Sequence, residues 1–270
     1  MLQLLKIEWL KVKNYPTFWI LLGLIVISIP ALNYIVFDLT DNAFPKNAKQ
    51  MQQMLLGRPF SFPLVWQTTG FLSSMILFIP SLLIITLTTN EFTYKTHRQN
   101  IIDGLSRTQF ILVKLVQVLL LALFCTLLQF GTTLWIGHLA AAPGEKIDQL
   151  ANIHQMGYYF VEAISYVMLS FLLSILIKRA ALVVGIFFLY SIIAEQIIVQ
   201  ILHKFGNNEG DFMPLQTADK LLPNTYLRIF SKPEEVAAWQ HMLPYYLLAA
   251  GIYFTLYCAF SLWYFRTKDL

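Results

Sequence analysis

Six apolar stretches in this sequence are each long enough to cross a lipid bilayer. A spanning helix needs about 20 apolar residues, each adding about 1.5 Å along its axis. Apolar residues make up 57% of the chain and charged residues 13%, against about 45 to 50% and about 25% in soluble domains. The sequence therefore predicts an all-α integral membrane protein with six transmembrane helices. These are expected at Thr17–Phe37, Leu64–Thr89, Phe110–Leu139, Tyr158–Ile177, Ala180–Leu202 and Pro244–Phe265.

The remaining composition excludes several classes of site. The net charge is only +4, and the basic residues form short clusters beside apolar stretches, so no basic face is available to bind nucleic acid. Cys125 and Cys258 both lie within apolar runs and are expected to be buried thiols. The five histidines are widely separated and show no H-E-x-x-H spacing, so no metal site is predicted.

The distribution of Lys and Arg predicts the orientation in the membrane. With the N-terminus inside, the inner segments carry eleven basic residues against four acidic ones, giving +7. The outer segments carry eight against nine, giving −1. Since basic residues concentrate in cytoplasmic loops, both termini are predicted to be cytoplasmic. The location expected for such a multi-pass protein is the plasma membrane of a prokaryote, that is, a bacterial inner membrane.

One transmembrane domain is predicted over residues 1–270, with distinct segments at its edges. Leu2, Leu5, Trp9 and Val12 recur at helical spacing, which predicts an amphipathic interfacial helix over residues 1–15. The alternative is a first span that simply starts early. The outer loop 203–243 has apolar residues at its end, which predict a short re-entrant or interfacial helix before Pro244.

The inner segment 91–107 has the clearest local signals. Residues 91–103 lack Pro and Gly and can form a short helix, which Gly104 is expected to end, because glycine accepts a left-handed conformation. Ser106 and Gln109 form a capping-box pattern that restarts a helix into the third span. The sequence thus predicts a short helix between two breaks beneath the membrane, which is well placed to dock into another protein.

This segment, together with the order of the elements, resembles the type-2 ABC exporter permeases, whose fold is the type V exporter fold. The resemblance rests on the pattern Glu91, Thr96, Arg98, Gly104, Ser106, Arg107, Phe110 and Lys114. It covers essentially the whole chain. In that family the segment is the coupling helix, and the resemblance implies that six residues couple the chain to an ATPase: Glu91, Thr96, Arg98, Gly104, Ser106 and Arg107. The alternative is a solvated loop whose basic residues only follow the positive-inside rule.

The resemblance also implies the partners. The sequence contains no G-x-x-x-x-G-K-[ST] loop, which ATP phosphates require. The chain is therefore expected to be a transport subunit rather than an enzyme and to bind no cofactor itself. ATP and Mg would be bound by a separate ABC ATPase subunit. Six spans form half of the membrane portion in this family, so a second copy or a related permease is expected, with membrane lipids around them.

Polar residues inside the second span predict either a transport pathway or helix packing. Gln67, Ser74, Ser81 and Thr88 are seven residues apart and form one seam along the helix. Pro80 is expected to bend this helix. Small polar residues also mediate ordinary helix packing. The family resemblance favours the pathway, because its second and fifth spans line the route.

Two carboxylates fall inside predicted spans, Glu162 in the fourth and Glu195 in the fifth. An ionised carboxylate at mid-bilayer costs at least about 2.5 kcal/mol on insertion scales, so each needs a partner. Glu195 is a candidate for an outer gate or substrate contact. Its alternative role is a structural hydrogen bond to the outer loop.

Two other functions compete with export. An intramembrane enzyme would need converging acids and histidines, which the sequence does not show. A membrane anchor or sensor could retain the permease fold without transport. The sequence does not separate lipids, peptides, antibiotics or drugs as substrates.

Overall fold

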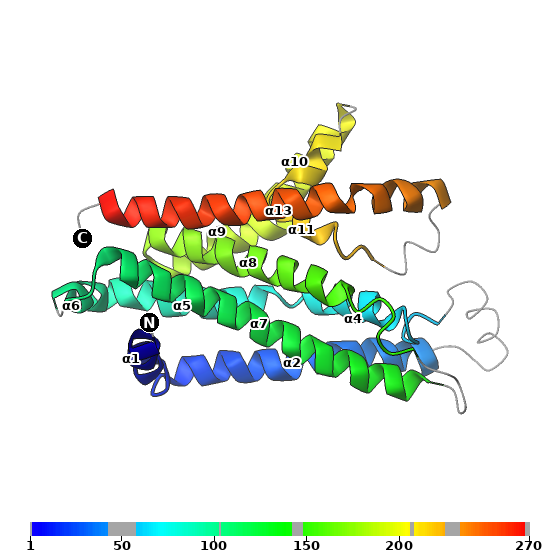
Figure 1. The fold of residues 1–270 in the computed structure, drawn as a ribbon, viewed down its shortest axis with the longest axis horizontal. Helices are drawn as coiled ribbons and strands as arrows, with labels where there is room; N and C mark the ends of the chain where they lie inside the picture. The colour runs from blue at the N-terminus through cyan, green and yellow to red at the C-terminus, as the bar shows by residue number, and fades with distance from the viewer. Residues whose placement is uncertain are drawn as a thin grey trace.

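The computed structural model describes residues 2–42, 58–102, 104–141, 148–205, 208–224 and 233–267, and within these ranges the regular structure is entirely helical (Figure 1). The helices of the N-terminal half are α1 (Leu2–Val12), α2 (Pro16–Asn42), α4 (Val65–Ser74), α5 (Phe78–Thr93), α6 (Thr96–Ile102) and α7 (Arg107–Ala140). Those of the C-terminal half are α8 (Gln155–Ile177), α9 (Ala180–Phe188), the π-helix η1 (Leu189–Ala194), α10 (Glu195–Lys204), the 3-10 helix η2 (Asn208–Phe212), α11 (Gln216–Asp219) and α13 (Pro233–Thr267).

The helix lengths confirm a multi-pass membrane protein. Within the described ranges, five continuous helical stretches are long and apolar enough to span a bilayer: α2, α7, α8, the run from α9 through α10, and α13. The predicted second span is instead a bent pair, in which α4 and α5 meet at 44°. Counting this pair as one span gives six.

The bend predicted at Pro80 is confirmed, and it lies just before the proline. Pro80 has no N–H to offer the carbonyl of Ile76, and that carbonyl accepts a hydrogen bond from the Ile79 amide at 2.8 Å. The Ser81 hydroxyl donates to the carbonyl of Leu77 at 2.9 Å. Local polar groups thus satisfy the carbonyls at the bend, as an apolar environment requires.

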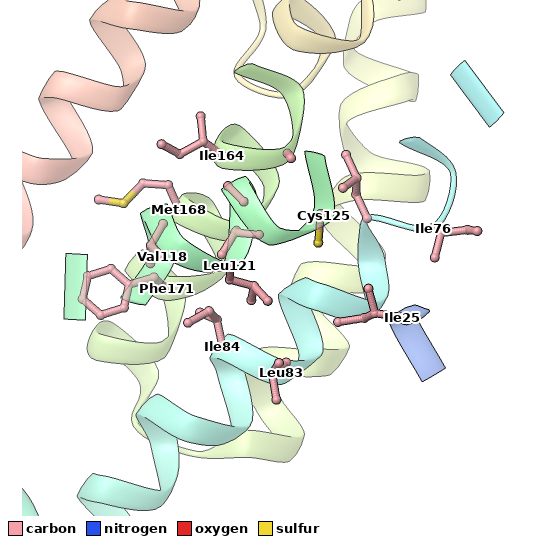
Figure 2. Packing of buried hydrophobic residues seen from close by; sticks show 14 of the residues in the cluster. Ile25, Ile76, Leu83, Ile84, Val118, Leu121, Cys125, Ile164, Met168 and Phe171 are labelled. Atoms are coloured by element: carbon pink, nitrogen blue, oxygen red, sulfur yellow. The ribbon is translucent and has the colours of Figure 1, made fainter. Parts of the chain in front are cut away.

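The core is centred on α8, which contacts α4, α5, α7, α9, α11 and α13. In its most apolar stretch 56% of the residues are buried, against 17% in α2 and in α13. Figure 2 shows Met168 and Phe171 of α8 beside Val118 and Leu121 of α7, with Ile84 of α5 nearby. The outer helices therefore turn much of their apolar surface away from the chain, as expected for helices that face lipid.

The two ends of the chain lie at the same end of the bundle, together with α1 and α6 (Figure 1). The predicted N-terminal helix exists as α1 and lies across that end. Trp9 of α1 packs against Phe18 and Trp19 at the start of α2, with ring centroids 6.3 and 6.1 Å away. This aromatic contact fixes the turn between the two helices.

The helix expected before Pro244 is not a separate element. α13 begins at Pro233 and continues through Pro244 to Thr267 without a break. Proline is favourable at a first helical position, and Glu234 and Glu235 in the first turn suit the helix dipole. The part of the outer loop that folds back into the bundle begins at η2 and continues past α11 to Leu221 and Leu222, which are buried. Residues 225–232 of the loop lie outside the described ranges.

Two glycines of α7 offer a test of how this helix packs against Phe62. A Cβ added at Gly137 would lie 2.5 Å from the ring of Phe62, whereas one at Gly131 would meet nothing within 4 Å. We expect Gly137→Ala to destabilise the protein by about 1 to 3 kcal/mol through overpacking. Gly131→Ala should stabilise it by about 0.5 to 1 kcal/mol through helix propensity. Thermal unfolding of both variants in detergent measures the difference, and equal effects would contradict the packing at Phe62.

Candidate functional site

The predicted short helix exists as α6, but its start is later than expected. Lys95 adopts a left-handed conformation, with φ at 55°, and separates α5 from α6. The helix therefore begins at Thr96, and Glu91 belongs to the last turns of α5. At the other end Gly104 has φ at +98°, as predicted for a helix stop. Asp103, the predicted last residue, lies outside the described ranges.

The predicted capping box at the start of α7 is confirmed. The Gln109 amide donates to the Ser106 hydroxyl at 3.2 Å, and the Ser106 amide donates to the Gln109 side chain at 3.0 Å. Two backbone donors at the helix start are satisfied in this way. The α6 segment is therefore held between two well-defined backbone breaks.

One side of α6 is anchored to the bundle through His97. This residue is buried, and its Nδ1 lies 2.8 Å from the carbonyl oxygen of Glu91. Its ring is 4.9 Å from that of Phe92, which also carries the Lys178 ammonium group 5.4 Å over its face. The Thr96 hydroxyl donates to the same Glu91 carbonyl at 3.5 Å. Movement of α6 is thereby linked to the end of α5.

The other side of α6 is exposed and carries a mixed apolar and cationic surface, which we call the α6 face: Tyr94, Arg98 and Ile102. Arg98 and Ile102 are four residues apart and lie on the same side of the helix. The exposed fraction is 78% for Ile102 and 70% for Tyr94, which precedes the helix. The segment lies outside the candidate membrane spans.

Beneath α6 lies a buried ionic network that the sequence did not predict. Lys114 of α7 contacts the carboxylates of both Glu91 of α5 and Glu8 of α1, the latter at 2.5 Å. Lys11 lies 2.7 Å from Glu8 and 3.7 Å from Glu91. Gln117 donates a further hydrogen bond to Glu8 at 3.0 Å. Three helices that are distant in sequence are joined by these contacts.

The network is electrically balanced, with two carboxylates facing two ammonium groups. Burial alone would raise the pKa of Glu8, but Lys114 and Lys11 outweigh it and lower that pKa to about 2. Glu8 is therefore ionised at neutral pH. The chance of detecting this site from sequence was small, because Glu8 and Lys114 are 106 positions apart.

The remaining coupling candidate, Arg107, is the first residue of α7 and contacts the end of α13. Its guanidinium group donates to the carbonyl of Arg266 near the end of α13 at 3.2 Å, and Arg266 donates to Thr108 at 3.1 Å. The structure thus brings Glu91, Thr96 and His97 together, while Arg107 fastens α7 to α13.

The polar seam of the second span is enclosed by the chain. Gln67, Ser81 and Thr88 are buried and Ser74 is half-buried. Gln67 donates to the carbonyl of Pro223 at 3.3 Å, and the Ser74 and Ser81 hydroxyls donate to carbonyls of their own segment. In a single chain these side chains serve packing and local hydrogen bonding.

Glu195 makes a structural hydrogen bond to the outer loop, which was the alternative to a role as an outer gate or substrate contact. One carboxylate oxygen accepts hydrogen bonds from the amides of Leu215 and Gln216 at 2.7 and 2.8 Å. These amides open α11, so Glu195 of α10 holds the returning outer loop in place. An N-terminal amide pair is a favourable partner for a carboxylate.

Asp219 is a half-buried acidic residue that the sequence analysis placed in the outer loop. The Tyr166 hydroxyl of α8 donates to it at 3.0 Å, and the carboxyl group of Glu162, also on α8, interacts with it electrostatically. Burial raises the pKa of Asp219 to about 7. The sequence signal that could have indicated packing of this segment against the bundle was the set of apolar residues around Asp219: Leu215, Ala218 and Leu221.

This carboxyl pair predicts a pH dependence of stability. An unfolded chain releases the Asp219 proton near pH 3.8, the ordinary pKa of an aspartate. The folded chain keeps this proton to a higher pH. The free energy of unfolding should therefore fall as the pH rises from 3.8 to about 7. Asp219→Asn should weaken this fall, whereas replacing the exposed Asp148 by Asn should leave it unchanged. Thermal unfolding measured across this pH range tests the prediction, and a curve for Asp219→Asn that matches the wild type would contradict it.

Comparison with known proteins places the chain in a family. A family model described as "Protein of unknown function (DUF2705)" matches residues 50–270. The chain belongs to the DUF2705 family. The DUF2705 match includes α6, Glu91 and Lys114 and leaves α1 and α2 outside it. No curated protein matches the chain. Among the residues described, no group of three or more His, Cys, Asp or Glu is placed to hold a metal ion.

Proposed function

We propose that this DUF2705 protein is the membrane-spanning permease subunit of an ATP-driven ABC exporter, and that α6 is its coupling helix. The observation that carries the proposal is the α6 face. A short helix between two backbone breaks presents Arg98 and Ile102 away from the bundle, outside the candidate spans. Exposed apolar residues in such a place indicate a protein partner.

The chemistry of the α6 face suits a docking surface. Tyr and Arg are enriched among the residues that contribute most to protein interfaces. Ile102 offers an apolar side chain for a pocket, with Arg98 beside it for a carboxylate of the partner. The partner would be the ABC ATPase subunit, which would bind ATP and Mg, because the chain has no phosphate-binding loop.

The contacts behind α6 provide a route for transmitting motion into the membrane. His97 and Thr96 hold the Glu91 carbonyl, and the Glu91 carboxylate holds Lys114. In this proposal Glu91 and Arg107 are positioning residues that act through α5, α7 and α13. Gly104 and Ser106 define the second break.

A second copy or a related permease would complete the transporter. The run from α9 through α10 carries an exposed apolar stripe, formed by Leu182, Ile186, Leu189, Ile193 and Ile197. This run is only 22% buried in its most apolar stretch. A pathway between two copies would involve the seam of Gln67, Ser74, Ser81 and Thr88, with Glu195, only after the helices around these buried residues rearrange. The location proposed is a bacterial inner membrane with both termini cytoplasmic.

Affinity purification tests the proposal. The tagged chain, purified from native membranes in mild detergent, is expected to carry with it a protein that contains G-x-x-x-x-G-K-[ST] and hydrolyses ATP. Vesicles containing the purified complex should hydrolyse ATP at a rate that depends on the permease. Repeated purification of the chain without any ATP-binding partner would count against the proposal.

A further inference from the structure

A cavity of about 430 Å³ lies between α1, α2, α5 and α7, on the membrane side of α1. Each helix contributes an apolar wall, represented by Trp9 of α1, Leu22 of α2, Ile84 of α5 and Leu120 of α7. The polar lining residues are Glu8 and Gln117, which are hydrogen-bonded to each other. The cavity thus offers its contents an almost entirely apolar surface.

The cavity is open towards the bilayer. Leu120 lines the cavity and is 53% exposed, and it lies within a candidate membrane span. Its neighbours on the outer surface of α7 are also apolar and exposed, for example Leu123 and Leu127. An opening in this surface faces hydrocarbon, so its natural occupant is an apolar chain from the lipid.

The charged residues below the cavity indicate the headgroup charge of the lipid that would occupy it. The charges of Glu8, Glu91, Lys11 and Lys114 cancel within the network. Lys6 of α1 and Lys13, which follows α1 directly, are exposed and add two positive charges at the same end. Juxtamembrane lysines attract anionic lipids with about 1 kcal/mol each.

Two tryptophans indicate the depth of this site. Trp9 and Trp19 are about half exposed and pack 6.1 Å apart. The Trp19 indole donates to the carbonyl of Lys13 at 2.8 Å. Indole rings are enriched at the level of lipid headgroups. Their position therefore places Lys13 at headgroup level and the cavity one layer deeper, among the acyl chains.

We infer that the cavity binds one acyl chain of an anionic phospholipid whose headgroup lies against Lys6 and Lys13. This site is separate from the α6 face and does not depend on the transport proposal. The lipid would connect α1 to α2, α5 and α7, and three of these helices, α1, α5 and α7, also form the ionic network.

Native mass spectrometry of the full chain, titrated in detergent with phosphatidylglycerol or phosphatidylcholine, tests the inference. The first phosphatidylglycerol is expected to bind roughly thirtyfold more tightly than the first phosphatidylcholine, because each of the two lysines contributes about 1 kcal/mol. The double variant Lys6→Gln, Lys13→Gln should remove this preference. Both lysines are exposed, so the double variant is expected to fold normally.

A matched pair of substitutions tests the cavity itself. Leu120→Trp should fill its mouth and weaken phosphatidylglycerol binding roughly tenfold. Leu127→Trp, at a similarly exposed position two turns away and outside the cavity, should have no effect. Equal binding of the two lipids by the wild type, or equal binding by the two tryptophan variants, would overturn the inference. Dimerisation blocked only by Leu120→Trp would also overturn it, because the occupant would then be a second copy.

Discussion

Replacing Lys114 by methionine is expected to destabilise the fold by about 3 to 5 kcal/mol, the cost of leaving buried charges unpaired. Lys114 is the central member of the network, since it contacts both Glu8 and Glu91. Methionine has a similar length, so little packing is lost. What remains after the substitution is two buried carboxylates with only the partly exposed Lys11 to balance them.

Reversible unfolding in mixed detergent measures this cost. Lys13→Met removes an exposed lysine and should change the free energy of unfolding by less than about 0.5 kcal/mol. The double variant Lys114→Met, Glu91→Gln should recover part of the loss, because it removes one charge of each sign. A Lys114→Met variant as stable as Lys13→Met would show that the network does not hold α1, α5 and α7 together.

Charge reversal on the α6 face is expected to abolish ATPase association while leaving the fold intact. The double variant Arg98→Glu, Ile102→Asp replaces a cation and an apolar anchor, and loss of such interface residues costs about 2 kcal/mol or more each. Binding should weaken by at least a hundredfold. Both residues are exposed, so thermal unfolding should be unchanged.

The measurement is the amount of ATPase retained on the purified permease, with Thr267→Asp as the control. Thr267 is exposed at the same end of the bundle, at the end of α13, and its substitution should retain the partner. Glu91→Ala is not a suitable probe, because Glu91 is buried and its loss disturbs the network. Retention of the ATPase by the α6 double variant would place the docking surface elsewhere.

Features set by short-range chemistry could be predicted from sequence. The apolar runs located the long helices, because a bilayer span requires a minimum apolar length. Gly104 and the pair of Ser106 and Gln109 were predicted correctly, since each acts within one helical turn. The bend before Pro80 follows from a single missing amide.

Features that depend on the packing of distant segments could not be predicted. Nothing in the local sequence pairs Glu8 with Lys114, and nothing near Asp219 shows that Tyr166 will meet it. The start of α6 depends on Lys95 adopting a left-handed conformation, which is uncommon for a residue with a Cβ. For the same reason the short helix was expected to begin at Glu91, which instead lies in the last turns of α5 and is buried.

Site-specific photocrosslinking from position 102 in native membranes tests the coupling role of α6 most directly. A photoreactive residue at Ile102 is expected to capture a protein that contains the G-x-x-x-x-G-K-[ST] loop. The same residue at Ile27, which is exposed on the span α2, should not capture it. Capture of that ATP-binding protein from position 102 alone is the result the permease assignment predicts. Capture of only lipid, or of a protein without an ATP-binding loop, would contradict it.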